Sequence, residues 1–347
     1  MRLCALMRVV SASTDIYIMR KIKQYTQYLA ILVPLAILKR LPLGCLKVLA
    51  SLGAQAAYYF PGMGSLISAN IRTVFPGWTP RQVRKVGKAS LKHLFWNMLE
   101  FFWINGDSRR IRRRYLMPED LRQYMIGQRD KHIAMIMVNT HLGSWEASGV
   151  MAPYYFENPM VAVAKPIHNP YINNLFNRQI RQMVPGFEVV FTKGAVKASI
   201  SALKAGKNLG ILVDQNTRVR DGGVWVDLFG LPVPGSASPA LLKRYCDQHN
   251  IAADIICGVS IRQDDGTLTV KTAQLPKPFA EYADDREVLQ DLMKISESFI
   301  RQYPEQYLWL YRRFAYIPPD CPEELKKRYP AYARVPNDHF FSKRRKK

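Results

Sequence analysis

MIMVNTHLGSWEASG, residues 135–149, sets an apolar run against one histidine, one glycine and one acid. The short run IAMIMV, residues 133–138, is continuously apolar, as expected of a buried strand, and the residues from Trp145 onward favour a helix. His141 therefore falls where a strand reaches the surface. Two interpretations are open: a reactive base paired with Glu146, or a polar residue bonded to a neighbouring carbonyl.

Apolar and helical segments alternate after this stretch. The pattern predicts strands at residues 160–164, 187–191, 209–213, 252–260 and 267–273, and helices at 145–156, 169–183, 195–205, 237–248 and 284–302. Upstream, Thr79 and Gln82 form the pattern of a capping box, with Pro80 at the first helical position. The alternation predicts an α/β domain whose mainly parallel central sheet is flanked by helices.

The first 62 residues are expected to form an apolar, membrane-associated helical segment. Residues 28–38 and 41–60 are largely apolar, but Lys39 and Arg40 separate them and Lys47 interrupts the second run. Neither run reaches the ~18 uncharged residues of a clear membrane span. A pair of core helices is the alternative. Residues 63–318 are then expected to be the α/β domain, and residues 319–347 a basic C-terminal tail.

The charge balance is strongly basic, with 50 Lys and Arg against 27 Asp and Glu and a net charge of +23. Such a surplus attracts nucleic acid, anionic lipid head groups or an acidic protein. The arginine cluster SRRIRRRY, residues 108–115, is expected on a solvated surface or against lipid phosphates. The five cysteines are odd in number and form no CxxC pair, which indicates neither a disulfide framework nor a zinc site and fits a reducing compartment.

Polar residues follow three of the expected strands, in NTHLGSWE, AKPIHNPY and DQNT. Ligands of open α/β sheets bind outside the carboxyl ends of the strands, so three polar strand exits predict a site. His141 and Glu146 are five positions apart, about 140° around one helix. They can pair only if His141 lies in a turn, which Gly143 allows, and Glu146 on the helix that follows. Glu146 would then accept from one ring nitrogen while the other takes a proton from an alcohol.

The blocks VNTHLGSWE, KPIHNPYINNLFNRQIRQM, GILVDQNT, VWVDLFGLPVPGSASPALL and PEQYLWLYRRF occur in an order that resembles the late acyltransferases of lipid A biosynthesis. These are the Kdo2-lipid A lauroyl/myristoyl transferase type, within the glycerolipid acyltransferase superfamily and its His-x4-acid motif. The resemblance covers residues 25–318. It implies transfer of a fatty acyl chain from acyl carrier protein to a hydroxyl of a phosphorylated glycolipid acceptor. It also implies a membrane partner, the cytoplasmic face of the inner membrane, and no cofactor, metal or nucleic acid.

The resemblance implies His141 as the general base and Glu146 as the residue that orients it. The substrate-binding positions that it implies are Asn139, Arg178, Arg181, Asp214, Gln215, Arg312 and Arg313. Guanidinium groups suit phosphate or an oxyanion, while a solvated helix face is the alternative for the arginines of the second block. A turn cap is the alternative for Asp214.

Alternating Tyr307, Trp309 and Tyr311 are expected to pack in the core. The chain departs from the family pattern at GSASPA, so neither Ser236 nor Ser238 receives a role.

Other acceptors fit the same chemistry, namely a lysophospholipid, a glycolipid or an aminolipid. The sequence alone separates neither these acceptors, nor acyl carrier protein from acyl-CoA as donor, nor one chain length from another. A basic nucleic-acid-binding protein is a second class, but it leaves the apolar amino-terminal segment unexplained. A serine hydrolase acting through Ser144 is a third, although the GxSxG pattern is absent.

Overall fold

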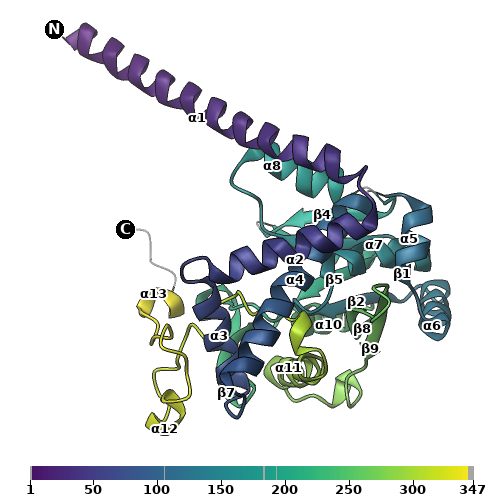
Figure 1. Ribbon diagram of the computed structural model, residues 1–347. Helices are drawn as coiled ribbons and strands as arrows, with labels where there is room; N and C mark the ends of the chain where they lie inside the picture. Colours follow the sequence, from purple (N-terminus) through teal and green to yellow (C-terminus); the bar gives the residue numbers. More distant parts are fainter. Residues whose placement is uncertain (1, 105, 183, 193, 343–347) are drawn as a thin grey trace.

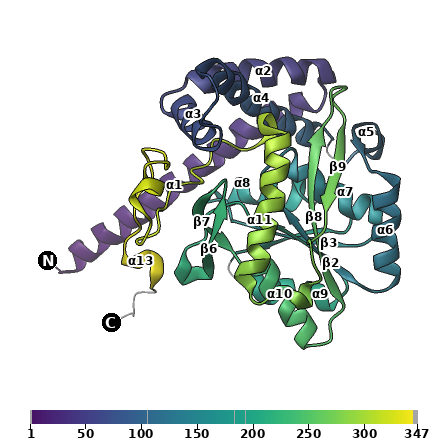
Figure 2. The ribbon, with the colours of Figure 1, turned by 90° about the horizontal axis from the view of Figure 1, so that it is seen from below.

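A seven-stranded sheet lies at the centre of the molecule (Figures 1 and 2), in the order β1-β9-β8-β2-β5-β3-β4. The computed structural model describes residues 2–342 except 105, 183 and 193, with side chains from residue 18 onward. The strands of this sheet are β1 (Tyr115–Leu116), β2 (Ala134–Asn139), β3 (Met160–Ala164), β4 (Phe187–Phe191), β5 (Asn208–Leu212), β8 (Ala253–Arg262) and β9 (Leu268–Ala273). Neighbouring strands are parallel except β8 and β9, which are antiparallel. The predicted mainly parallel sheet is confirmed.

Helices flank the sheet on both faces. They are α1 (Arg2–Leu38), α2 (Leu43–Tyr59), α3 (Met63–Val74), α4 (Pro80–Ile104), α5 (Ser108–Arg114), α6 (Glu119–Asp130), α7 (Trp145–Phe156), α8 (Pro170–Asn174), α9 (Ala195–Lys204), α10 (Ser238–Gln248), α11 (Asp285–Gln302), α12 (Glu323–Lys326) and α13 (Asp338–Phe341). Short 3₁₀ turns occur at η2 (Val219–Asp221), η3 (Phe279–Glu281) and η4 (Pro304–Gln306), and a π-helix, η1 (Leu175–Ile180), continues α8. The capping box at the start of α4 is confirmed, because Thr79 N donates to Gln82 Oε1 at 2.8 Å and Gln82 N to Thr79 Oγ1 at 3.3 Å.

The continuously apolar strand β2 is explained by burial on both of its faces. Met135 packs in one cluster with apolar side chains of α6 and α7. Ile136, its neighbour, packs in another cluster with side chains of α9, α10 and α11. Successive side chains of a strand point to opposite faces of the sheet. Because both faces are covered here, neither set of alternate residues is exposed, and the sequence of the strand does not alternate between apolar and polar residues.

The amino-terminal segment divides into two parts. Helix α2 packs on α4, burying Leu46, Ala50 and Ala54, so it is a layer of the folded domain. Helix α1 extends outward from that layer (Figure 1) and touches the domain where Asn169 Nδ2 donates to Gln24 O at 2.8 Å. In the part of the chain that the structure describes, no helix has the length and apolar character needed to cross a membrane.

Residues beyond the expected boundary at 318 fold back on the domain. Cys321, Tyr329 and Phe340 are buried there, and the Tyr329 hydroxyl donates to Pro232 O at 2.6 Å. The folded region therefore continues into α13, and the end of the basic tail, KRRKK at 343–347, lies outside the described residues.

A separate hairpin of β6 (Gly223–Leu228) and β7 (Leu231–Ser236) was not predicted as strands. Phe229 and Gly230 form its two-residue turn with φ angles of 56° and 70°. Two positive φ values are the geometry of a tight turn that matches the twist of the strands. The hairpin packs beside α11, where Asp227 N donates to Gln290 Oε1 at 2.8 Å.

Candidate active site

The loop from His141 to Ser144 leaves β2 and is held by backbone bonds to two other segments. Gly143 N donates to Gln306 O at 3.0 Å, Leu308 N to His141 O at 3.0 Å, and Ser144 N to Ser260 O at 2.8 Å. Gly143 has a φ of +64°, and a Cβ there would lie 1.9 Å from Ser260 O. Only glycine fits this position, because another residue meets both backbone strain and a collision with main chain.

A buried amide supports the same loop from α4. Asn97 Nδ2 donates to Gly143 O at 2.8 Å, and Asn97 Oδ1 accepts from Arg262 Nη2 at 2.5 Å. Arg262 is anchored in turn by Glu100, whose Oε2 lies 2.6 Å from Arg262 Nη2. Buried charges that are paired and hydrogen-bonded resist movement, so this network holds the loop that carries His141 in place.

The His141 ring is held by Asp214, not by Glu146. Asp214 Oδ1 lies 2.7 Å from His141 Nδ1, and Asp214 Oδ2 accepts from the His141 backbone N at 3.1 Å. The two residues meet because β2 and β5 are adjacent and parallel, so their carboxyl ends lie at one edge of the sheet. The Trp145 ring, 5.0 Å away centre to centre, packs edge-on against the imidazole.

Asp214 is 2% exposed, and its surroundings favour the ionised form. Burial by itself raises the pKa of this carboxyl, but the His141 charge, the bonds from the His141 ring and backbone, and the Arg313 charge outweigh it and lower the pKa. A carboxylate in this position accepts the Nδ1 proton and leaves the other ring nitrogen, Nε2, unprotonated in the neutral ring.

The second ring nitrogen faces an amide. Gln215 Nε2 lies 3.2 Å from His141 Nε2, the geometry of an amide N–H donating to an unprotonated imidazole nitrogen. Gln215, expected as a substrate-binding residue, thus lies beside the His141 ring. Its amide stands where a hydroxyl would lie to give its proton to His141.

Glu146 pairs with Arg181, which corrects the expected His141–Glu146 contact. Arg181 Nε donates to Glu146 Oε2 at 3.0 Å and Nη2 to Oε1 at 2.5 Å. No hydrogen bond joins His141 to Glu146 among the described residues. The two side chains point in different directions. His141 points toward the residues that follow β5, while Glu146, in the first turn of α7, points toward the segment after η1.

A π-helix sets the position of Arg181. Arg181 N donates to Phe176 O at 2.9 Å, five residues back, and Arg181 Nη1 donates to Asn177 Oδ1 at 2.6 Å. Single-turn π-helices occur frequently at functional sites because they redirect side chains. Arg178, on the same segment, is exposed.

The remaining expected site residues lie in different surroundings. Arg313 is buried at 2% exposure, and its Nη1 donates to Asn216 Oδ1 at 2.5 Å and to Pro234 O at 3.0 Å, which corrects its expected place against an acceptor. Arg312 is exposed and lies over the Tyr332 ring. Ser236 and Ser238 bond to each other at 2.7 Å. The Ser144 hydroxyl has no hydrogen-bond partner among the described residues, and the ring partners of His141 are Asp214 and Gln215.

The three polar strand exits do not all converge. The exits of β2 and β5 meet at His141 and Asp214, but the exit of β3 turns toward α1, where His168 Nε2 lies 3.1 Å from Arg20 Nη2. The β3 exit contributes to the site indirectly, because the helix that follows it leads to Arg181.

A small apolar cavity of about 20 Å³ lies beside α7 and β2, and its lining includes Asn139 at the end of β2. Asn139 and Ser148 line it on either side of the loop 141–144 in the sequence, and Met151 and Phe156 line it further along α7. The span from Ser148 to Phe156 is about 12 Å at 1.5 Å per residue. Asn139 therefore lies in the wall of this cavity and not against the His141 ring.

Tyr307 is a site residue that the sequence interpretation missed. Its hydroxyl donates to Asp214 Oδ2 at 3.1 Å. The alternating aromatics of this block were expected to pack in the core, and Tyr307 is indeed buried at 4% exposure. The missed signal was its phenolic hydroxyl, since a buried tyrosine hydroxyl generally finds a polar partner.

Comparison with known proteins agrees with this geometry. Residues 17–315 match the family described as bacterial lipid A biosynthesis acyltransferase. A lipid A biosynthesis lauroyltransferase of Escherichia coli (strain K12) is 24% identical over 303 residues, which cover 85% of this chain and 90% of that protein. The chain therefore belongs to the bacterial lipid A biosynthesis acyltransferases and is itself an acyltransferase.

Proposed function

We propose that this acyltransferase moves a fatty acyl chain from acyl carrier protein to a hydroxyl of a lipid A precursor, with His141 as general base. The observation that carries the proposal is the 2.7 Å bond between His141 Nδ1 and Asp214. It holds the ring in the tautomer whose Nε2 is free to accept a proton. Asp214 takes the orienting role that the motif suggested for Glu146.

The reaction follows from that tautomer. An acceptor hydroxyl displaces the Gln215 amide and gives its proton to His141 Nε2 while its oxygen attacks the thioester carbonyl. The Nδ1 proton stays on His141 and bonds to Asp214, which stabilises the imidazolium. Collapse of the tetrahedral intermediate breaks the carbon–sulfur bond, and the Nε2 proton passes to the departing thiolate of the carrier.

Glu146 and Arg181 form a second catalytic element in this proposal. Arg181 donates two bonds to Glu146 and a third to Asn177. Further N–H groups of its half-buried guanidinium remain for a substrate. A preorganised guanidinium stabilises an oxyanion or a phosphate without reorganising during the reaction. Arg178 and Arg312, both exposed, are available to the phosphorylated acceptor.

The apolar cavity along α7 suits the acyl chain only if its side chains move apart, because the enclosed space is about 20 Å³. Its methionine-rich wall, with Met137 and Met151 near the polar end, is adaptable and excludes water.

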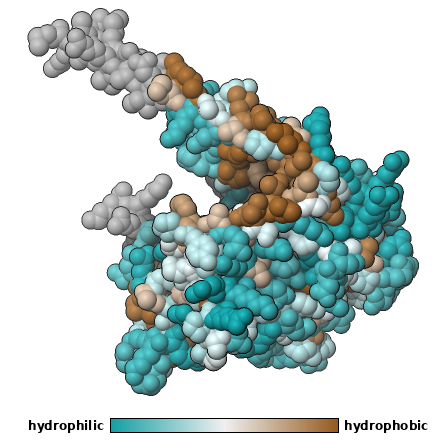
Figure 3. Space-filling view, in the orientation of Figure 1, coloured by the Kyte–Doolittle hydropathy of each residue, from teal (hydrophilic) through white to brown (hydrophobic). Residues whose placement is uncertain are grey.

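A membrane surface is the proposed setting, on the cytoplasmic face of the inner membrane. Large apolar side chains are exposed along one region, here called the α1–α2 apolar face: Ile18, Met19, Ile22, Tyr25, Leu29, Val33 and Ile37 of α1, and Val48, Leu49, Leu52, Tyr59 and Phe60 of α2 and its end. Figure 3 shows this apolar surface continuing from α1 onto the body. Lys39 and Arg40 join the two helices. An apolar face bordered by cations suits insertion among anionic lipid head groups.

The catalytic proposal is tested with purified protein, long-chain acyl carrier protein and a lipid A precursor. Release of free carrier and a mass increase of one acyl chain on the precursor are expected. His141→Ala should abolish both while the circular dichroism and melting temperature stay unchanged. Activity that survives this substitution contradicts the mechanism, and acylation of a lysophospholipid in place of the precursor contradicts the acceptor.

The membrane proposal has its own test. Leu52→Glu and Val33→Glu, on the α1–α2 apolar face, should reduce co-sedimentation with vesicles containing anionic phospholipid. Leu241→Glu is the matched control, because Leu241 is 51% exposed on α10, outside that face. Equal binding by all three variants contradicts the assignment of this face.

A further inference from the structure

We propose that Tyr307 is a positioning residue that keeps the Asp214 carboxylate aimed at His141, and that the buried Arg313, bonded to Asn216 two residues further along the chain, supports that arrangement. The inference rests on the proposed role of His141 as base and goes beyond it, because neither residue touches the His141 ring. Both come from the last block of the sequence, whose aromatics suggested core packing and whose arginines suggested acceptor binding.

Tyr307 completes the set of donors around Asp214. Asp214 Oδ1 receives the His141 ring nitrogen, and Oδ2 receives both the His141 backbone N and the Tyr307 hydroxyl, each at 3.1 Å. A carboxylate with three donors in this arrangement cannot rotate without breaking bonds at both oxygens. Burial and the adjacent Asp214 charge raise the pKa of Tyr307 well above its usual value, so the phenol stays a donor.

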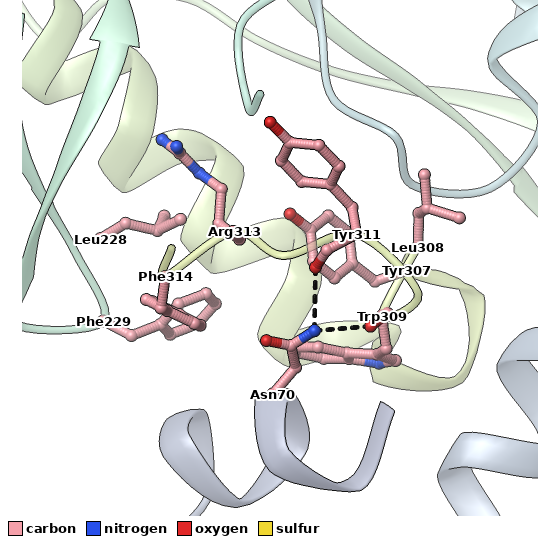
Figure 4. A pocket seen from close by; sticks show the side chains of 9 residues that line it. All are labelled: Asn70, Leu228, Phe229, Tyr307, Leu308, Trp309, Tyr311, Arg313 and Phe314. Carbon is pink, nitrogen blue, oxygen red and sulfur yellow. Dashed lines mark hydrogen bonds between the residues drawn. The ribbon is translucent and has the colours of Figure 1, made fainter. Parts of the chain in front are cut away.

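The segment that carries Tyr307 is itself fixed to the body. Asn70 of α3 donates from Nδ2 to Trp309 O at 2.6 Å and to Tyr311 O at 2.9 Å, the two contacts drawn in Figure 4. On the other side, the Gln306 amide exchanges two bonds of 2.9 Å with the Arg262 backbone. The Tyr307 hydroxyl is therefore presented from a rigid segment that also forms the bridge with Leu142.

Arg313 supplies a buried positive charge that is bonded to Asn216, two residues from Asp214. Its Nη1 is bonded to Asn216 and Pro234, while Nε and Nη2 have no hydrogen-bond partner among the described residues. A buried cation without a contacting counter-ion is costly to folding, so its retention calls for a reason. Its field acts on Asp214, since the Arg313 charge lowers the pKa of that carboxyl.

The charged and titratable groups around Asp214 come from two places. His141 faces it from the loop after β2, and Tyr307, Tyr311 and Arg313 face it from the segment after η4. Glu146 and Arg181 are bonded to each other. Without the Tyr307 hydroxyl, the negative charge of Asp214 is less compensated and stabilises a protonated His141 ring more strongly. Removing the Arg313 cation acts in the same direction. Either change should favour protonated His141.

The test compares Tyr307→Phe with Tyr329→Phe in the full-length protein. Both substitutions delete one phenolic hydroxyl from a buried ring, but the Tyr329 hydroxyl bonds to Pro232 O away from the site. We expect Tyr307→Phe to lower kcat about tenfold with KM unchanged, the loss of one bond to a charged group. We also expect the acid limb of its rate–pH profile to move to higher pH. Tyr329→Phe should leave both unchanged.

A readout independent of turnover separates this inference from the proposed function. The ring nitrogens of His141, followed by ¹⁵N NMR in the ligand-free protein, should titrate at higher pH in Tyr307→Phe than in the parent. Arg313→Met should shift the midpoint in the same direction, and Arg313→Lys, which keeps the charge, should restore most of it. Unshifted midpoints in Tyr307→Phe and Arg313→Met overturn the inference even if His141→Ala is inactive, whereas an active His141→Ala overturns the proposed function.

Discussion

Asp214 Oδ1 lies 2.7 Å from His141 Nδ1 although 73 residues separate the two in the sequence. The acid five positions from His141, Glu146, bonds to Arg181 in place of the ring. The site therefore contains two carboxylates with different partners. Each has a different expected effect when its charge is removed.

Asp214→Asn should reduce kcat by about 10²- to 10⁴-fold, the range of a general base and its orientation. The neutral amide no longer stabilises the imidazolium, and it can donate to Nδ1, which favours the wrong tautomer. Initial rates of carrier release at saturating substrate measure the effect. A variant that keeps more than half of the parent rate shows that Asp214 does not orient the base.

Glu146 and Arg181 should behave as a unit. Glu146→Gln, Arg181→Gln and the double variant should lower kcat/KM by similar factors, giving a coupling energy of about 1–3 kcal/mol. The reason is that each partner fixes the other through two bonds. The ¹⁵N titration of His141 should change less in Glu146→Gln than in Tyr307→Phe. Additive losses in the cycle argue for separate roles.

Gly143→Ala should both inactivate and destabilise the protein. A Cβ at residue 143 would lie 1.9 Å from Ser260 O, so the loop must move and carry His141 with it. Gly222→Ala is the control, since Gly222 has a φ of +87° but no atom within 4 Å of a built Cβ. Both variants carry backbone strain of about 1 kcal/mol or more, but only Gly143→Ala meets a main-chain collision. Rates normalised to folded protein should fall for Gly143→Ala alone.

His93 should make stability fall with acidity. Burial and the charges of Arg262 and Lys92 lower its pKa from 6.5 to about 4, so the folded protein binds fewer protons than the unfolded chain between those values. Above pH 6.5 both states hold the neutral ring. As pH falls from 6.5 to 4, the free energy of unfolding decreases by up to about 3 kcal/mol.

Denaturant titrations across that range measure the effect in the parent and in two variants. His93→Gln should flatten the dependence. His249→Gln, at an exposed ring, is the matched control and should leave it intact. A parallel slope in His93→Gln and the parent assigns the acid sensitivity to other groups.

The sequence between residues 145 and 191 predicted its local structure well. WEASGVMAPYYF was expected as a helix and forms α7 over Trp145–Phe156, and the strands at 160–164 and 187–191 are β3 and β4. Hydrophobic periodicity and caps act over a few residues, so the sequence carries that information directly. The hairpin β6–β7 was missed, because its second strand contains Pro232, Pro234 and Gly235, residue types that are depleted in strands.

The α/β class and the family were predicted from the sequence, and the catalytic role of His141 stays a prediction. The partner of His141 was not predicted correctly. Motif spacing suggested Glu146, whereas the adjacency of β2 and β5 brings Asp214 to the ring. Tyr307 bonds to that carboxylate, and Arg313 bonds to Asn216 beside it, from a segment whose pattern suggested only packing and acceptor contact.

Sequence by itself determined most strands of the central sheet and the helices between them, and that a histidine follows β2, because propensity, capping and apolar periodicity are local. Only the tertiary structure decided which acid that histidine meets, because strand order is set by burial of whole faces and not by spacing along the chain. It also decided that Glu146 pairs with Arg181, that the buried Tyr307 hydroxyl donates to Asp214, and that the Arg313 charge acts on the same carboxyl.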